Sequence, residues 1–254
     1  MKILHSRVLG EGSPLVILHG FLGMGDNWKT LANKFAENYE VHLLDQRNHG
    51  RSFHSDEFSL EILVEDLWDY IEFHKLDTIN LLGHSMGGKV AMLFASKYPK
   101  RIQKLLIADI SPRKYPAHHQ DILTALNAVD FKIQSSREEI EKVLERYIPQ
   151  HGVRQFLMKN ITRVDRDTYK YRFNLQSITD DYHEITIGLP SEVRYDGETL
   201  FLRGDTSGYI GIEDEILIHN HFPNTEIVTV INSGHWLHAD NPIDFYSEVV
   251  SFLD

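Results

Sequence analysis

The stretch Gly83-His84-Ser85-Met86-Gly87 constrains this chain more than any other part of its sequence. It follows the apolar run 79–82 and precedes a helical pattern over 89–98, which together predict a strand, a tight turn and a helix. A serine in such a turn has strained backbone, and the glycines two residues before and after it relieve the clash between strand and helix. Because this context distinguishes G-x-S-x-G from a chance match, we predict that Ser85 is a nucleophile.

Further apolar runs alternate with helical patterns along most of the chain. Short runs at 14–18, 39–44 and 104–108 predict buried strands, amphipathic stretches at 28–35 and 60–71 predict helices, and a first strand is expected within 2–10. Strand patterns return at 198–202 and 226–231, and residues 243–253 predict an amphipathic helix at the end of the sequence. This alternation predicts an α/β fold with a doubly wound, mostly parallel sheet.

The pattern changes between the strands at 104–108 and 198–202. Residues 120–129, 136–147 and 152–161 read as amphipathic helices, without a short Val/Ile/Leu run of the kind found in sheets. We therefore predict a core of residues 1–112 and 190–254, with residues 113–189 inserted as a helical cap over the strand ends.

Composition excludes several classes of function. The chain has 26 basic and 37 acidic residues, a formal charge of −11, and no Lys/Arg-rich run, so a nucleic-acid partner is not expected. The absence of cysteine excludes disulfides, thiolate metal sites and a cysteine nucleophile, and it suits a reducing compartment. The first apolar run, 15–18, is too short for a signal peptide or a membrane span. We expect a cytoplasmic protein without a membrane partner, either a monomer or a homodimer.

A serine nucleophile needs a base and a carboxylate that orients the base. His235 follows a glycine in the loop after the last predicted strand, and this position separates it from the other histidines among the 15 in the chain. Asp109 at the end of strand 104–108 and Asp205 after strand 198–202 are both candidates for the carboxylate. Asp205 is expected to point away from His235, so Asp109 is favoured and Asp205 is the alternative.

Backbone N–H groups near Ser85 are candidates for binding a developing oxyanion. The N–H of Met86 lies at the start of the helix after Ser85, and the glycine-containing loop 19–23 can present a second N–H group. In that loop His19 is expected to be structural. Candidate pocket residues come from this loop, the turn at 45–52, the cap and the loop at 232–236: Phe21, Leu22, Asn48, Tyr115 and Trp236. The turn at 45–52 is expected to be mostly structural, and His49 is a candidate there together with Asn48.

Five segments carry a resemblance to the α/β-hydrolase superfamily, and within it to the small bacterial esterases of the YbfF type: 19–23, 45–50, 83–89, 107–112 and 234–239. The resemblance implies that Phe21 supplies the second oxyanion N–H and that Asp109 is the acid, because this group has serine where relatives carry the acid after strand 198–202. It also implies a small helical cap, no cofactor, and hydrolysis of short-chain esters and some acyl-CoA thioesters.

The resulting hypothesis is a serine hydrolase that cleaves small carboxylic esters through an acyl-enzyme. A thioesterase acting on acyl-CoA and a C–C bond hydrolase are alternatives on the same triad. Basic residues in or beside the cap could meet CoA phosphates or form a solvated face: Arg113, Lys114, Lys159, Arg163, Arg166, Lys170 and Arg172. A binding module without turnover is disfavoured because every triad member is present. A metal site at His118-His119 or at His219 and His221 is disfavoured because no His/carboxylate set has i, i+4 spacing.

Overall fold

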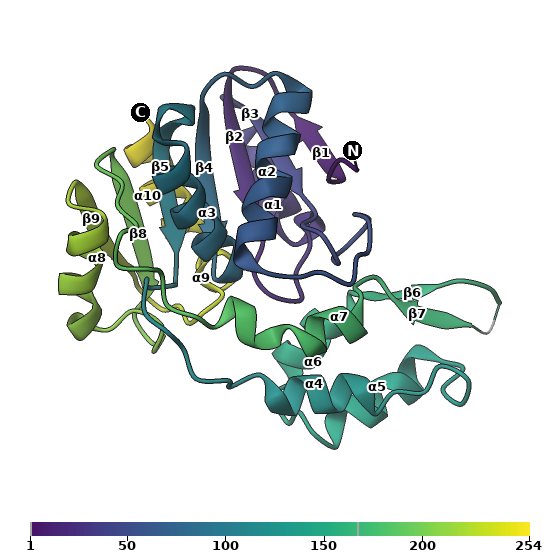
Figure 1. The fold of residues 1–254 in the computed structure, drawn as a ribbon. Helices are drawn as coiled ribbons and strands as arrows, with labels where there is room; N and C mark the ends of the chain where they lie inside the picture. Colours follow the sequence, from purple (N-terminus) through teal and green to yellow (C-terminus); the bar gives the residue numbers. More distant parts are fainter. Residues whose placement is uncertain (1, 167) are drawn as a thin grey trace.

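A seven-stranded sheet forms the centre of the computed structural model, which describes residues 2–166 and 168–254. The strands lie in the order β1-β3-β2-β4-β5-β8-β9 (Figure 1). Only β1 is antiparallel to its neighbour, and the other adjacent pairs are parallel, which confirms the predicted mostly parallel sheet. The bounds are β1 (Ser6–Leu9), β2 (Ser13–Leu18), β3 (Tyr39–Leu44), β4 (Ile79–His84), β5 (Ile102–Ala108), β8 (Thr199–Gly204) and β9 (Thr225–Val230).

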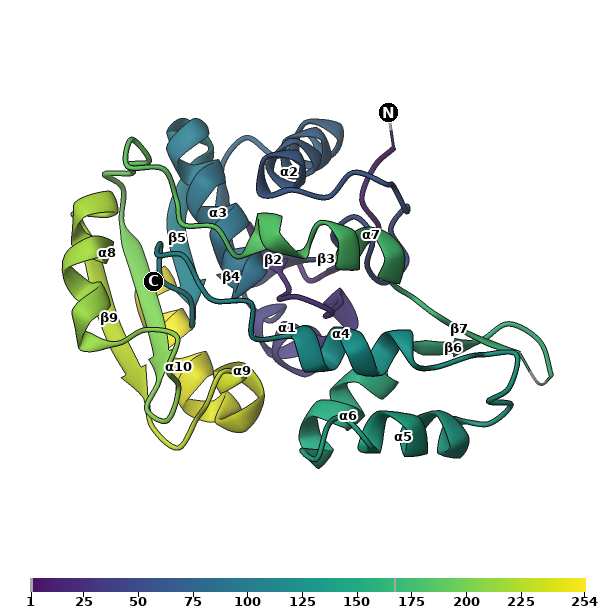
Figure 2. The same cartoon turned by 60° about the horizontal axis from the view of Figure 1, so that its bottom comes forward.

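Helices cover both faces of this sheet (Figure 2). One face packs against α1 (Lys29–Phe35), α9 (Leu237–Asp240) and α10 (Pro242–Leu253), and the other against α2 (Leu60–His74), α3 (Met86–Lys97) and α8 (Glu215–His221). Short 3-10 turns are η1 (Gly25–Trp28), η2 (Pro99–Arg101), η3 (Tyr182–Ile185) and η4 (Ile212–Asp214). Because both faces are covered, the central strands read as continuous apolar runs.

The segment between β5 and β8 lies beyond the carboxyl ends of the parallel strands (Figure 1). It contains α4 (Gln120–Asn127), α5 (Arg137–Glu145), α6 (His151–Met158), α7 (Leu175–Asp180) and a two-stranded antiparallel sheet, β6 (Ile161–Arg163) with β7 (Tyr169–Tyr171). The two ends of the segment run side by side, since the Leu189 N–H donates to the Pro112 carbonyl at 2.8 Å. Boundaries at 113 and 189 stay a prediction.

The sequence pattern predicted neither the β6–β7 hairpin nor α7 in this segment. The strands of the hairpin have three residues each and contain Thr, Arg, Lys and Tyr rather than an apolar run, so periodicity gives no signal for them. Among the residues that the structure describes, no helix is long and apolar enough to cross a membrane.

Candidate active site

The turn between β4 and α3 holds Ser85 in strained backbone, with φ 53° and ψ −118°. The neighbouring glycines have no room for a side chain. A Cβ on Gly83 would lie 2.2 Å from the carbonyl oxygen of Gly87, and one on Gly87 would lie 2.5 Å from that of Leu18. These contacts explain why small residues flank the serine, and the turn presents Ser85 at the carboxyl end of the central strand.

Ser85, His235 and Asp109 form one hydrogen-bonded chain although they lie far apart in the sequence. His235 Nε2 is 3.1 Å from Ser85 Oγ, and His235 Nδ1 is 2.7 Å from Asp109 Oδ2. A carboxylate oxygen accepts, so Nδ1 carries the proton and the free Nε2 faces the serine hydroxyl. The arrangement has the contacts of a nucleophile, a base and an orienting acid.

Asp109 is fully buried at the end of β5, in a left-handed conformation with φ 51°. Its Oδ1 accepts the N–H of Gly204 at 3.1 Å, and its Oδ2 accepts the hydroxyl of Ser207 at 2.5 Å as well as His235 Nδ1. Three donors therefore compensate the buried carboxylate and fix its direction.

Asp205, the alternative acid, makes different contacts. Its side chain is exposed, and its Oδ1 accepts the N–H of Ser233 at 2.8 Å. This backbone bond holds the pKa of Asp205 below its ordinary value. Asp205 therefore braces the loop that precedes His235, and Asp109 is the carboxylate in contact with the imidazole.

Two further residues support His235, and the sequence analysis identified neither. The Tyr209 ring stacks on the imidazole with centroids 3.7 Å apart and an interplanar angle of 14°. His84 Nε2 lies 2.7 Å from the His235 carbonyl oxygen, so this nitrogen donates, and burial lowers the pKa of His84 well below 6.5. His84 is the second residue of the G-x-S-x-G motif, and its place next to Ser85 is the sequence feature that could have identified it.

The N–H groups of Phe21 and Met86 are free to bind an oxyanion. Within residues 2–166 and 168–254, neither group donates a hydrogen bond to the protein. The Phe21 loop passes close to the serine, because a Cβ on Gly20 would lie 3.2 Å from Ser85 Cβ. Free N–H groups beside a nucleophile suit the charge that develops in acyl transfer.

Buried histidines hold the Phe21 loop in place. His19 Nε2 accepts the Gln46 N–H at 3.0 Å and Nδ1 donates to the Gly20 carbonyl at 2.8 Å. His49 Nε2 accepts the Leu22 N–H at 3.2 Å. Burial lowers the pKa of His19 to about 4 and that of His49 to about 3, so both are neutral near pH 7. Both histidines therefore have structural contacts.

Two cavities meet at Ser85. The first has an empty volume of about 550 Å³ and includes His235, Trp236 and Leu22 in its walls. The second has an empty volume of about 340 Å³ and includes Met86 and Tyr115. The cap contributes further residues to both walls: Ile122, Phe156 and Leu157 line the first cavity and Tyr182 lines the second.

The prediction that Asn48 lines the pocket is not supported by its position. Asn48 is fully buried and lines neither cavity. Its Nδ2 donates to Ser177 Oγ at 3.0 Å, and its Oδ1 accepts the Ser55 N–H at 2.8 Å. Because these bonds occupy its amide, Asn48 joins the turn after β3 to α7 instead of facing a substrate.

Comparison with known proteins gives the family. A family model described as alpha/beta hydrolase fold matches residues 13–140. The chain belongs to the alpha/beta hydrolase fold family. This hydrolase is 36% identical to sn-1-specific diacylglycerol lipase ABHD11 of Mus musculus, over 94% of this chain and 80% of the relative. It is 32% identical to Esterase YbfF of Escherichia coli, over 91% of this chain and 89% of that protein.

A solved structure extends these similarities to the whole chain. The marine microorganism esterase superposes with a TM-score of 0.96 at 41% identity, covering 99% of the hydrolase and 100% of that chain. The resemblance to esterases of the YbfF type is thereby confirmed, as is the prediction of a hydrolase that cleaves esters.

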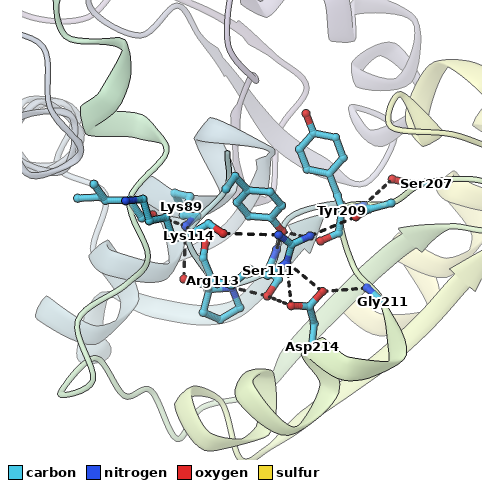
Figure 3. Close-up of polar contacts among 12 residues, drawn as sticks. Lys89, Ser111, Arg113, Lys114, Ser207, Tyr209, Gly211 and Asp214 are labelled. Atoms are coloured by element: carbon cyan, nitrogen blue, oxygen red, sulfur yellow. Dashed lines mark hydrogen bonds and ion pairs between the residues drawn. The ribbon is translucent and has the colours of Figure 1, made fainter. Parts of the chain in front are cut away.

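A polar network joins the loop after β8 to the beginning of the cap segment in the hydrolase (Figure 3). The Asp214 carboxylate accepts Ser111 Oγ at 3.0 Å and the Gly211 N–H at 2.9 Å, and pairs with Arg113 Nε at 3.0 Å. The Tyr115 hydroxyl donates to the Tyr209 carbonyl at 2.5 Å. These contacts fix the loop whose tyrosine ring covers His235.

The basic residues considered for CoA do not line the two cavities at Ser85. Arg113 is paired with Asp214. Five others lie in or beside the β6–β7 hairpin and line neither cavity: Lys159, Arg163, Arg166, Lys170 and Arg172.

The two histidines considered for a metal, His118 and His119, have tyrosine partners instead. His118 Nε2 lies 2.5 Å from the Tyr209 hydroxyl, and His119 Nδ1 lies 2.7 Å from the Tyr182 hydroxyl.

Proposed function

We propose that this hydrolase is a carboxylesterase that cleaves small carboxylic esters with Ser85 as nucleophile, His235 as base and Asp109 as the acid. One observation carries the proposal: His235 lies 2.7 Å from the Asp109 carboxylate and 3.1 Å from the Ser85 hydroxyl. A hydroxyl is a weak nucleophile at neutral pH unless an adjacent base removes its proton.

In acylation, Ser85 Oγ bonds to the ester carbonyl carbon while its proton moves to His235 Nε2. The resulting imidazolium is stabilised by Asp109. When the bond between the carbonyl carbon and the alcohol oxygen breaks, His235 returns the proton to that oxygen and the alcohol leaves.

In deacylation, water replaces the alcohol. The water oxygen attacks the acyl carbon while His235 takes a proton from the water. The bond between the acyl carbon and Ser85 Oγ then breaks, and His235 returns the proton to Ser85 Oγ. The carboxylic acid is released. The N–H groups of Phe21 and Met86 bind the oxyanion in both halves, and loss of one such donor typically costs about 2.7–4 kcal/mol.

Hydrolysis of p-nitrophenyl butyrate tests this assignment. We expect Ser85→Ala to lower kcat by several orders of magnitude while the thermal unfolding temperature stays near that of the parent. The exposed Ser135 provides a matched control, because Ser135→Ala removes the same atom at a position that lines neither cavity. Retention of parental kcat by a folded Ser85→Ala enzyme would overturn the proposal.

The cellular setting is a separate proposal. A cysteine-free sequence supports the cytoplasm, where thiols are kept reduced, and we propose a monomer or a homodimer. Sedimentation of the purified chain decides between these two states, and fractionation of its cells tests the compartment.

A further inference from the structure

The two cavities at Ser85 differ in which part of the catalytic machinery they contain. The first is lined by His235 and Trp236, and the second by Met86 and Ile110. Ser85 and Phe21 line both. A substrate carbonyl at Ser85 therefore has the histidine on one side and the start of α3 on the other.

The chemistry of acyl transfer makes these two sides unequal. The alcohol oxygen must come within hydrogen-bond reach of His235 Nε2 to receive the proton as it leaves. The carbonyl oxygen must point toward the N–H groups of Phe21 and Met86. With these two directions occupied, the acyl chain is left with the cavity that His235 does not line.

The walls of the second cavity present apolar surface. Ile110 and Ile185 contribute aliphatic side chains. The tyrosine hydroxyls are engaged by the protein: Tyr115 donates to the Tyr209 carbonyl, Tyr182 meets His119 Nδ1, and Tyr209 meets His118 Nε2. Hydroxyls with protein partners leave ring faces and aliphatic groups for a ligand, which suits a hydrocarbon chain.

Lys89 also lines the second cavity, but its ammonium is engaged elsewhere. Its Nζ donates to the carbonyl oxygens of Arg113 at 2.6 Å and Ile187 at 2.5 Å, with a longer contact to Pro112 at 3.4 Å. The side chain is fully buried. The Lys89 ammonium is thus directed at the two ends of the cap segment and away from an acyl group in the second cavity.

Both cavities at Ser85 adjoin a wider outer cavity. An outer cavity with an empty volume of about 990 Å³ has His235, Trp236 and Val153 in common with the first cavity. It also has His118, His119 and Tyr209 in common with the second cavity. The outer cavity also has polar residues in its walls, among them Asp121 and Gln150. The first cavity is the larger of the two at Ser85, with an empty volume of about 550 Å³ against about 340 Å³, so a leaving group on the His235 side has more room than an acyl chain on the other side.

We propose that the second cavity binds the acyl chain and the first cavity binds the alcohol, which makes the substrates esters of short to medium apolar acids with alcohols of larger and more varied size. This assignment rests on the proposed function, because it requires Ser85 to be acylated. It predicts that kcat/KM depends strongly on the length of the acyl chain and only weakly on the size of the alcohol.

Two series of esters test the assignment. The first series keeps p-nitrophenol and varies the acid from acetate through butyrate and hexanoate to octanoate. The second keeps butyrate and varies the alcohol from ethanol through glycerol to 2-naphthol. Each enzyme is described by two ratios of kcat/KM, octanoate over acetate and naphthyl over ethyl.

One variant narrows each cavity. Ile185→Phe fills the second cavity and is expected to lower the acyl ratio by about tenfold or more, with the alcohol ratio near that of the parent. Val153→Phe fills the first cavity and is expected to lower the alcohol ratio instead. Ile185→Ala removes atoms and should raise the acyl ratio, so the test stands even where the Phe variant fails to fold.

The outcomes separate the two proposals. A lower acyl ratio for Val153→Phe, or equal effects of both Phe variants on both ratios, would overturn the cavity assignment while Ser85-dependent hydrolysis remained. Hydrolysis that persists in folded Ser85→Ala would instead overturn the proposed function.

Discussion

The Ser207 hydroxyl donates a 2.5 Å hydrogen bond to Asp109 Oδ2, the oxygen that also accepts His235 Nδ1. Ser207 Oγ in turn accepts the Tyr209 N–H at 3.2 Å, which directs the hydroxyl proton to the carboxylate. One serine therefore contacts both the acid and the residue whose ring covers the imidazole.

Removing this hydroxyl should weaken catalysis more than binding. Hydrogen bonds to charged groups contribute about 1.5–3 kcal/mol, so we expect Ser207→Ala to lower kcat by roughly tenfold to a hundredfold with little change in KM. Steady-state kinetics on p-nitrophenyl butyrate measures this. Ser191→Ala, at an exposed serine, is the control, and an unchanged kcat for Ser207→Ala would show that Asp109 needs no such support.

The same substitution at two aspartates distinguishes the acid from its alternative. Asp109→Asn should lower kcat by about 10⁴, because an amide in that position favours the wrong imidazole tautomer and stabilises no imidazolium. Asp205→Asn should leave kcat near the parent value, since Asp205 contacts backbone at Ser233. Kinetics of the two variants side by side checks this, and the reverse result would identify Asp205 as the acid.

Stability should fall as the pH is lowered from neutrality. Burial lowers the pKa of five histidines from the ordinary value of 6.5. The pKa falls to about 4 for His19 and to about 3 for His49, His119 and His238, and it lies well below 6.5 for His84. Between these values and 6.5 the unfolded chain binds protons that the folded chain does not. Stability from these groups is therefore complete above pH 6.5 and is lost toward pH 4, by up to about 1.4 kcal/mol per pH unit for each histidine.

Urea unfolding between about pH 7.5 and pH 4.5 measures this loss. A free energy of unfolding that stays constant over this range would contradict neutral burial of these rings.

Two glycine variants should have opposite effects on stability. A Cβ on Gly83 would lie 2.2 Å from the Gly87 carbonyl oxygen. In the part of the chain that the structure describes, no atom lies within 4 Å of a Cβ placed on Gly152. We expect Gly83→Ala to destabilise the fold by about 3 kcal/mol or more, and Gly152→Ala in α6 to stabilise it by about 0.5–1 kcal/mol. Urea denaturation compares them, and similar values would refute the crowding at the turn.

Local sequence constraints predicted the sheet and the residues at the ends of its strands. The apolar runs correspond to β2, β3, β4 and β5, because strands covered on both faces need apolar residues throughout. The positions of Ser85, Asp109 and His235 at or after strand ends then follow from chain order. Their hydrogen bonds required the folded structure.

Long-range packing set what the sequence did not predict. Tyr209 reaches His235 only because the Asp214 network and the cap place its loop. Asn48 looked available as a polar turn residue, but its amide partner Ser177 lies 129 residues away in α7. The β6–β7 hairpin is short and polar, so it leaves no periodic signal.

Covalent labelling of Ser85 tests the central claim most directly. A fluorophosphonate that mimics the ester should add one phosphonyl group per chain, and peptide mass spectrometry should find it on Ser85, with loss of esterase activity in proportion to labelling. His235→Ala should label far more slowly, because the base is gone. A label on another residue, or full activity after Ser85 is modified, would contradict the account.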